Sequence, residues 1–280
     1  MVKKSGLKFD EIGYWSEIKL NIIKEYAAAF SKIMSAQKGF YHIYIDAFAG
    51  AGMHVSKTTG KSISGSPIRT LYIDTPFREY HFIDKNKNKV NVLKDLVGDR
   101  ADVHYYVDDC NLVLLEKVFP KVRYEKFERG LCLLDPYGLH LNWKVVEAAG
   151  KCKSMEILLN FPVMDMNMNV LKHKLDTVGP AHIERMNAFW GDESWREIAY
   201  TKEMDLFGAE EERKEDIRML TKAYQERLKK VAGFGYVPEP IAMRNTKGSI
   251  VYYLFFATQN PTGGKIVGDI FSKYRRRGMM

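Results

Sequence analysis

The chain has few cysteines and no clustered metal-binding residues. Its three cysteines, Cys110, Cys132 and Cys152, are widely spaced within 280 residues. An odd number at such distances is neither a disulfide framework nor a Cys-x-x-Cys metal pattern, and we interpret them as small buried apolar side chains. The seven histidines form no His-x-x-His or His-Glu-x-x-His pair. We therefore predict no structural metal site.

Long apolar runs are also missing. No stretch reaches the ~18–20 apolar residues of a membrane helix, and no apolar run follows Lys3 and Lys4, as it would in a secretory signal. We therefore expect a cytoplasmic protein without a membrane partner. The absence of a Gly-x-x-x-x-Gly-Lys-Ser/Thr loop disfavours a P-loop nucleotidase. Gly50 and Gly52 lack the third glycine that is typical of a dehydrogenase.

The composition that remains is that of a globular protein with a basic surface. Hydrophobic residues make up 46% of the chain and charged residues 28%, which suits one α/β domain over residues 1–280. The net charge of +8 allows an anionic partner such as RNA or DNA. The clearest basic cluster is Lys273–Arg277, which fits either a contact to phosphates or a solvated flexible tail.

Hydrophobic periodicity predicts a Rossmann-like order of elements. Residues 14–34 have the spacing of an amphipathic helix. Short apolar runs at 42–48, 79–84, 102–109, 130–136 and 156–162 then alternate with helical segments, as in a buried parallel sheet. A terminal β-hairpin would complete seven strands. This α/β layout is that of a class I S-adenosylmethionine (SAM) methyltransferase, with a mostly parallel sheet.

The predicted domain has four parts. An N-terminal helix at 14–34 precedes a Rossmann-like core at 40–163. The Met- and Trp-rich segment 165–235 is predicted to be a helical insertion that includes one charged helix from Leu206 to Val231. Its methionines fit core packing or a partner surface. A hairpin and a closing helix at 236–272 complete the chain.

Glycines follow the first predicted strand directly. The motif runs from Asp46 through Phe48 to Gly50 and Gly52. Glycines at a strand exit let the backbone turn tightly and approach a ligand closely. We predict a nucleotide-type pocket here, with these four residues as candidate donor contacts. A tight strand exit without a ligand is the alternative.

Acidic residues end the next two strands. Asp84 stands where such sheets bind a ribose diol, although it could equally begin a loop. Asp108 and Asp109 end the third strand, and an acid there can receive the adenine amine. An Asp before a helix is also a good N-cap. Between the two aspartates we select Asp108 as the candidate adenine contact.

The fourth strand ends in Asp135-Pro136-Tyr137-Gly138. The Asp135 carboxylate or nearby carbonyls could accept the hydrogens of an amine and direct its lone pair to a methyl donor. Pro136 stiffens the corner, and Tyr137 could stack on a flat base. These three residues are the candidate catalytic group. A turn that only closes the strand is the alternative.

These motifs together resemble the three-Cys-motif partner family. The likeness is carried by the Trp15–Tyr26 helix, Asp46–Gly52, Gly65-Ser66-Pro67, Leu134–Gly138 and Asn260–Val267, and it spans about residues 10–272. Members of that family look like SAM-dependent methyltransferases and occur beside a protein with a three-cysteine motif. The resemblance therefore implies SAM as cofactor and such a protein as a possible partner.

A shorter likeness, over about residues 15–145, is to bacterial ribosomal RNA adenine-N6 methyltransferases. It implies that Lys19 and Ser66 lie near the donor and that Asp135 faces the acceptor. Ser66 before Pro67 is also a plain helix start. Amino-methyltransferases usually have Asp/Asn-Pro-Pro-Tyr/Phe, whereas here the second proline is missing and the aromatic comes one place early.

Two functions from different classes follow. The first is a SAM-dependent methyltransferase acting on an amino group of a nucleic-acid base. The second is a partner or regulatory module that keeps the fold and docks a three-cysteine-motif protein through 165–235, without catalysis.

Overall fold

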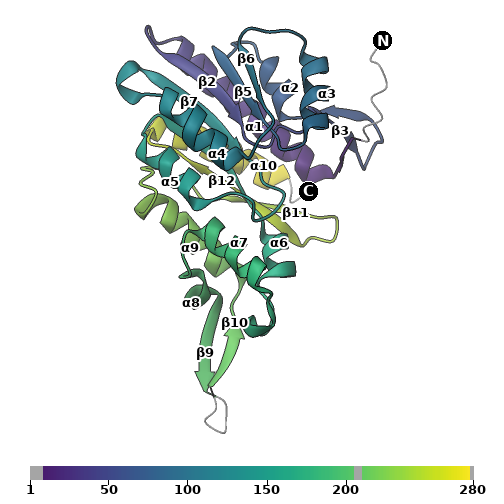
Figure 1. Cartoon of the computed structure of the whole chain (residues 1–280), viewed down its shortest axis with the longest axis vertical. Coiled ribbons are helices and arrows are strands. Elements are labelled where there is room, and N and C mark those ends of the chain that lie inside the picture. The colour runs from purple at the N-terminus through teal and green to yellow at the C-terminus, as the bar shows by residue number, and fades with distance from the viewer. Residues whose placement is uncertain (1–8, 205–209, 278–280) are drawn as a thin grey trace.

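A seven-stranded sheet forms the centre of the molecule (Figure 1). The computed structural model describes residues 9–204 and 210–277. The strand order is β11-β12-β8-β7-β2-β5-β6. All neighbours from β8 to β6 are parallel, and only β12 runs against the others. The strands are β2 (Tyr41–Asp46), β5 (Glu79–Ile83), β6 (Val103–Tyr106), β7 (Glu128–Leu134), β8 (Met155–Phe161), β11 (Ile241–Arg244) and β12 (Ile250–Ala257).

This topology is the class I methyltransferase fold predicted from the sequence. Five parallel strands carry a terminal hairpin, and the last strand of the hairpin is inserted antiparallel beside β8. After β2, the chain first adds β5 and β6 on one side of β2 and later adds β7 and β8 on its other side. The strand order therefore reverses between β2 and β7, which is where doubly wound sheets bind ligands.

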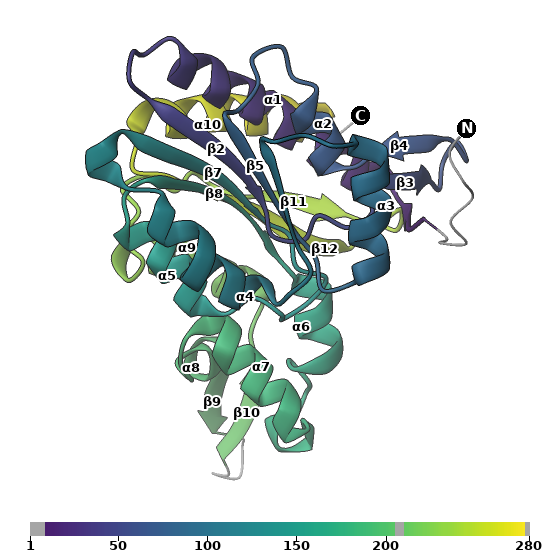
Figure 2. The same cartoon turned by 45° about the horizontal axis from the view of Figure 1, so that its top comes forward.

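Helices cover both faces of the sheet (Figure 2). Consecutive strand residues point to opposite faces, so Tyr44 joins one apolar core and Ile45 the other. Helices α1, α2 and α10 lie over the first core, and α4, α5 and α9 lie on the other side of the sheet. The bounds of these helices and of α3 are α1 (Tyr14–Ser35), α2 (Ser66–Leu71), α3 (Lys87–Val97), α4 (Cys110–Leu112), α5 (Trp143–Lys151), α9 (Ile217–Lys230) and α10 (Pro261–Arg277).

The two terminal helices pack together, which corrects one interpretation of the basic cluster. Helix α10 lies against α1 on the sheet. Lys273 pairs with Glu25 at 2.8 Å, and Arg275 pairs with Glu239 at 3.5 Å. Tyr274 is buried beside them. Lys273–Arg277 thus lies within helix α10, where Lys273 and Arg275 are paired and Tyr274 is buried, and is not a flexible tail.

The segment after β8 extends away from the sheet (Figure 1). It contains α6 (Val163–Asn169), α7 (Pro180–Trp190), α8 (Trp195–Ala199) and an antiparallel hairpin of β9 (Tyr200–Met204) and β10 (Glu210–Lys214). The expected helix from Leu206 is wrong in its first half. Leu206 itself lies outside the described residues, Glu210–Lys214 is a strand, and the helix begins at Ile217. Charged residues of high helix propensity are held in the strand by hairpin pairing.

A small sheet not expected from the sequence closes one end of the core. It joins β1 (Glu11–Ile12), β3 (Met53–Ser56) and β4 (Ser62–Ser64) in the order β1-β3-β4. The N-terminal segment is thereby fixed against the chain that follows Gly52. No helix within the described ranges combines the length and the apolarity that crossing a membrane requires.

A buried carboxylate on β8 connects this strand to α1 and to the chain after β12. Glu156 of β8 accepts hydrogen bonds from the hydroxyls of Tyr26 in α1 and Thr258 after β12, the latter at 2.8 Å. Burial raises the pKa of Glu156 to about 7, although both hydrogen bonds oppose this change. The folded state therefore holds a proton that the unfolded state releases at lower pH.

We expect Glu156→Gln to remove a pH-dependent part of the stability. Because the folded pKa is raised, the contribution of Glu156 is largest below its ordinary pKa of 4.5 and is lost as pH rises toward about 7. The wild type should therefore lose stability relative to the variant over that interval, by about 3 kcal/mol. Urea unfolding of both proteins between these pH values measures the difference. A constant difference across the interval would contradict the assignment.

Candidate functional site

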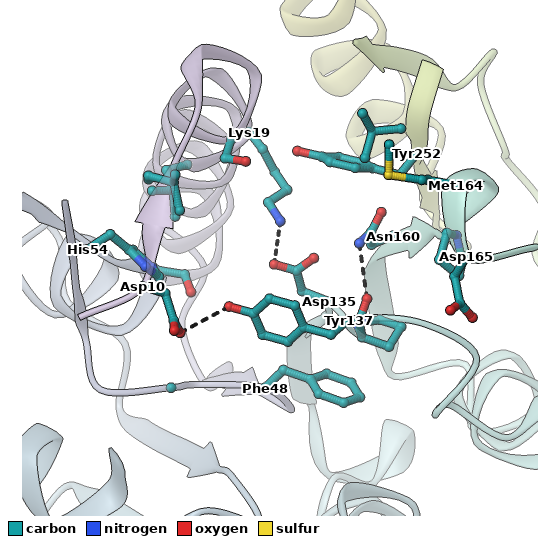
Figure 3. A pocket seen from close by; sticks show the side chains of 18 of the residues that line it. Asp10, Lys19, Phe48, His54, Asp135, Tyr137, Asn160, Met164, Asp165 and Tyr252 are labelled. Atoms are coloured by element: carbon teal, nitrogen blue, oxygen red, sulfur yellow. Dashed lines mark hydrogen bonds and ion pairs between the residues drawn. The ribbon is translucent and has the colours of Figure 1, made fainter. Parts of the chain in front are cut away.

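A pocket of about 420 Å³ opens at the point where the strand order reverses. The carboxyl ends of β2 and β7 supply its floor, and α1, the small sheet, α6 and β12 supply its walls (Figure 3). Its size is that of a small-molecule site. The lining residues are Asp10, Ile12, Ser16, Lys19, Leu20, Phe48, Ala49, Gly50, His54, Ser66, Asp135, Pro136, Tyr137, Asn160, Pro162, Met164, Asp165, Met168, Asn169, Val251 and Tyr252.

An ion pair between Lys19 and Asp135 crosses the pocket (Figure 3). Lys19 comes from the second turn of α1 and is 8% exposed, and its Nζ lies 2.5 Å from Oδ2 of Asp135. Burial lowers the pKa of Lys19, but the Asp135 carboxylate outweighs it and raises that pKa above its ordinary value. The lysine therefore stays charged. Its ammonium also lies 5.0 Å from the ring centre of Tyr252, a cation–π distance.

Asn160 presents an unpaired oxygen next to Asp135. It lies near the end of β8 and is 7% exposed. Its Nδ2 donates to the Pro136 carbonyl at 3.2 Å, while its Oδ1 has no hydrogen-bond partner among the residues that the structure describes. A buried acceptor without a partner costs free energy. A ligand N–H in the pocket would satisfy it.

Asp46 supports the floor of the pocket from below. Ser66 Oγ donates to Asp46 Oδ2 at 2.6 Å, and the backbone N–H of Phe48 donates to Oδ1 at 3.3 Å. Burial raises the pKa of Asp46 to about 7, while the Ser66 hydrogen bond acts against this rise. Asp46 is fully buried and is absent from the residues that line the pocket. It thus positions the loop and Ser66, whose predicted nearness to the donor remains a prediction.

The start of α2 differs by one residue from the plain helix-start pattern. Gly65 is the N-cap, and Ser66 and Pro67 are the first two helical residues. The Ser66 side chain is therefore not used as a cap and bonds to Asp46 instead.

Gly50 has a backbone conformation that favours a residue without a side chain. Its φ of +62° is in the left-handed region that favours glycine, and it lines the pocket. Its N–H donates to Asp84 Oδ2 at 3.0 Å, and the N–H of Asn86 donates to Asp84 Oδ1 at 2.7 Å. Asp84 therefore holds the glycine loop in place. Asp84 is not among the pocket-lining residues, so its contact to a ribose stays a prediction, although each of its oxygens keeps a lone pair that could accept a hydroxyl.

Gly52 has a packing role that the motif does not reveal. Its φ is +77°, and a Cβ there would lie 2.6 Å from the Leu93 side chain. Its carbonyl accepts the N–H of Gly65 at 2.7 Å, which ties the loop to the start of α2. Gly52 is not among the pocket-lining residues. Its predicted contact to a donor is unsupported by this geometry.

Tyr137 stands at the mouth of the pocket with 75% of its surface exposed. Its hydroxyl donates to Asp10 Oδ2 at 3.3 Å, and Lys89 Nζ lies 5.6 Å from its ring centre. Lys89 also pairs with Asp10 at 2.7 Å. The N-terminal segment therefore holds the ring in a fixed position. The ring of Phe48 lies on the floor side of the same opening (Figure 3).

The two aspartates after β6 lie outside this pocket. Asp109 caps the helix by accepting the N–H of Asn111 at 2.8 Å, and it pairs with Lys85 at 2.5 Å. Asp108 is partly exposed and pairs with Lys117 at 3.3 Å. The capping alternative is thus observed for Asp109, and the described pocket residues do not include Asp108. Its selection as the adenine contact stays a prediction without support from the geometry.

Several pocket residues were not predicted. Asp10 directly precedes β1, His54 lies in β3 of the unexpected small sheet, Tyr252 in the reversed strand and Asp165 in α6. Burial lowers the pKa of His54, and the charge of Lys19 lowers it further, so its ring is neutral at neutral pH. Asn160 had a weak signal, because it is a lone amide within an apolar strand. The others had none, because only the fold brings their segments together.

Comparison with known proteins does not identify a family for this chain. No protein-family model matches the sequence, and no curated protein matches it. A solved protein from Legionella pneumophila is 11% identical, covers 91% of this chain and 92% of its own, and has a TM-score of 0.48. A candidate SAM-dependent methyltransferase from Listeria monocytogenes is 11% identical, with coverages of 84% and 99% and a TM-score of 0.42. The methyltransferase domain of bacterial CtHen1-CN is 10% identical, with coverages of 85% and 99% and a TM-score of 0.41.

These low scores leave the fold assignment to the strand order described above. The likenesses to the three-Cys-motif partner family and to ribosomal RNA adenine methyltransferases stay predictions.

Proposed function

We propose that this chain is a SAM-dependent methyltransferase that modifies an amino group of a nucleic-acid base. The observation that carries the proposal is the position of Asp135 and Asn160. Both lie in one pocket at the reversal of a class I methyltransferase sheet, and the buried Asn160 Oδ1 has no partner within the described residues. Two carboxylate or amide oxygens at that place can hold the two hydrogens of an amine.

The residues present fit the cofactor. The left-handed Gly50 has no side chain to fill the space above the floor, and no described atom lies within 4 Å of a Cβ built on it. The Asp84 carboxylate stands directly behind that glycine. The pocket volume of about 420 Å³ suits a nucleoside-sized ligand. Lys19, Gly50, Ser66 and Phe48 would contact the donor, and Asp84 would take its ribose. SAM supplies an electrophilic methyl group when it is bound.

The side chains at the end of β7 would prepare the acceptor. Lys19 engages Oδ2 of Asp135, which leaves Oδ1 to accept one amine hydrogen. Asn160 Oδ1 would accept the other. This pairing directs the nitrogen lone pair toward the donor, and positioning of two reactants supplies much of a rate enhancement. The amine can lose its proton after it has attacked, so that no strong base is needed.

The nucleic-acid part of the proposal has two supports. Tyr137 presents an exposed ring at the mouth of the pocket, where it can stack on an extruded base. The net charge of +8 favours a polyanion. The Lys273–Arg277 cluster offers less free positive charge to phosphates than its sequence suggests, because Lys273 and Arg275 are paired with acidic residues within the fold.

Calorimetric titration with SAM and with its demethylated product is the first test. We expect micromolar binding by the wild type and at least about tenfold weaker binding by Asp84→Ala, because the variant releases the N–H of Gly50. Asp102→Ala is a matched control, since Asp102 pairs with Arg100 just before β6 and, unlike Asp84, accepts no N–H from the glycine loop. Unchanged affinity in Asp84→Ala would contradict the assigned role of Asp84.

The same titration separates the second function from the first. If the wild type binds neither molecule, the fold has lost its donor or needs another protein. The partner module that docks a three-cysteine-motif protein would then be the better proposal.

A further inference from the structure

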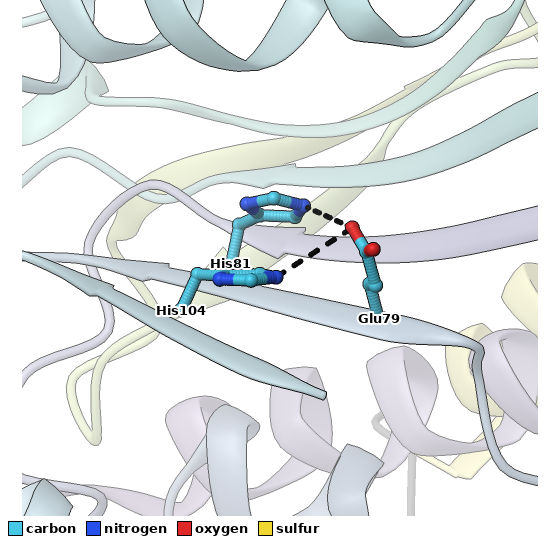
Figure 4. A group of neighbouring side chains, drawn as sticks. All are labelled: Glu79, His81 and His104. Carbon is cyan, nitrogen blue, oxygen red and sulfur yellow. Dashed lines mark ion pairs between the residues drawn. The ribbon is translucent and has the colours of Figure 1, made fainter. Parts of the chain in front are cut away.

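A second cluster of chemically active side chains lies on the sheet away from the pocket (Figure 4). It consists of Glu79 and His81 on β5 and His104 on β6. Residues i and i+2 of a strand share a face, and His104 is the register partner of His81. The backbone therefore fixes all three on one face of two paired strands. Glu79 is the first residue of β5, whereas the pocket lies at the carboxyl ends of the strands.

We propose that Glu79, His81 and His104 form a binding site for a divalent transition metal, best matched by Zn²⁺. Two imidazole nitrogens and one carboxylate oxygen make a ligand set typical of zinc sites that keep a fourth position for water. This site is independent of the proposed methyl transfer.

The distances in the cluster fit a shared metal better than hydrogen bonds. Glu79 Oε2 lies 3.4 Å from Nε2 of His81 and 3.7 Å from Nε2 of His104. Both separations exceed the 2.7–3.2 Å of ordinary N–H···O hydrogen bonds. With metal–ligand bonds of about 2.0–2.1 Å, two ligands of a tetrahedral zinc lie about 3.4 Å apart. All three ligand atoms lie within 4.8 Å of one another.

Neighbouring hydroxyls hold two of the ligands. The Tyr106 hydroxyl lies 3.1 Å from His81 Nδ1, and the Tyr41 hydroxyl donates to Glu79 Oε1 at 2.8 Å. Each contact uses the atom that does not face the centre of the cluster. Metal-ligating histidines typically make such a bond through the other ring nitrogen, which sets the direction of the ligating one.

His104 is the adjustable member of the cluster. The two imidazole rings are stacked, with centroids 4.9 Å apart and an angle of 26° between their planes. Their lone pairs therefore do not yet meet at one point. The buried His81 is held by Tyr106, whereas the His104 side chain is 42% exposed and has room to turn toward the shared position.

Calorimetric titration of the full chain with ZnCl₂ tests the site. We expect one saturable Zn²⁺ per chain and at least about tenfold weaker binding by His104→Ala, which removes one ligand. His173→Ala is the matched control, because His173 is an exposed histidine outside the cluster. It should bind as the wild type does. A wild type without saturable binding, or a His104→Ala variant that binds equally well, would overturn the proposal.

A second variant and a spectroscopic probe keep the proposal testable if His104→Ala does not fold. Glu79→Gln keeps the size of the side chain but weakens it as a ligand, and it should also lose Zn²⁺ affinity. Co²⁺ in place of Zn²⁺ should give the intense visible bands of a four-coordinate ion in the wild type, and these should disappear in both variants. Weak bands of a six-coordinate ion in the wild type would count against the three-ligand site.

Discussion

Asp135→Asn should reduce methyl transfer by at least about a hundredfold while the affinity for SAM changes little. The amide replaces one acceptor oxygen with a donor, so the acceptor amine can no longer be held with its lone pair toward the methyl group, and misplacement of a reactant by an ångström costs about that factor. The measurement is transfer of a radiolabelled methyl group from SAM to RNA and DNA oligonucleotides that contain adenine and cytosine. Full activity in the variant would remove Asp135 from the mechanism.

The ion pair complicates this variant, so a second one is needed. Without the Asp135 carboxylate, the buried Lys19 charge has lost its partner, and breaking such a pair is destabilising. Asn160→Ala leaves the Lys19–Asp135 pair intact and removes the other proposed amine acceptor. It should slow transfer about tenfold or more, while the melting temperature falls only slightly because the Pro136 carbonyl loses one hydrogen bond. If Asn160→Ala is fully active, the unpaired oxygen has another purpose.

Among the described glycines, Gly150 is the one where an added Cβ would approach another backbone atom most closely, and Gly150→Ala should be strongly destabilising. Gly150 lies in the last turn of α5, and a Cβ there would stand 1.9 Å from the carbonyl oxygen of Ala232 and 2.8 Å from its carbon. Both atoms belong to the backbone and cannot rotate away. We expect a loss of about 3 kcal/mol or more and a fall of the melting temperature on the order of 10 °C.

Gly268→Ala is the matched control for this prediction. Gly268 is also a helical glycine, in α10, but no described atom lies within 4 Å of its added Cβ. Alanine there should be neutral or should stabilise by up to about 1 kcal/mol, because glycine is the poorer helix former. Thermal unfolding of both variants beside the wild type measures the contrast. Equal melting temperatures would show that α5 can move away from Ala232.

The cluster of Glu79, His81 and His104 shows what residue spacing in the sequence cannot reveal. The histidines form no helical pair, and this led to the prediction that the chain has no structural metal. Glu79 and His81 have strand spacing, but the third member of the cluster comes from another strand. His104 reaches them only because β6 pairs with β5 in the register that sets it opposite His81. A register between two strands is a tertiary property.

The insertion shows the same limit for secondary structure. Met, Leu, Glu and Lys in the segment before Ile217 have high helix propensity, which favoured a helix there. Residues Glu210–Lys214 instead pair with Tyr200–Met204 in a hairpin. Intrinsic propensities differ by less than about 1 kcal/mol per residue, so backbone pairing between neighbouring segments can override them.

By itself, the sequence determined the order of the core elements and the edge of the sheet that carries the site. Apolar runs of strand length alternate with amphipathic helices, and buried parallel strands can pair only through such crossovers. Because acids and glycines follow the strands Tyr41–Asp46, Glu79–Ile83 and Glu128–Leu134, their place at one edge followed from that order. These patterns are local, so they can be recognised in the sequence without knowledge of how the elements pack.

Only the tertiary structure decided which of these residues share the pocket. Lys19 and Asp135 are 116 positions apart, and Asn160 and Tyr252 come from strands that meet through a reversed pairing. Asp46 turned out to lie beneath the floor and Asp108 beyond the pocket, although Asp46 ends β2 and Asp108 follows β6 closely. Where a side chain points after a strand ends depends on the turn it enters and on what packs against it, and neither is contained in the spacing of residues along the chain.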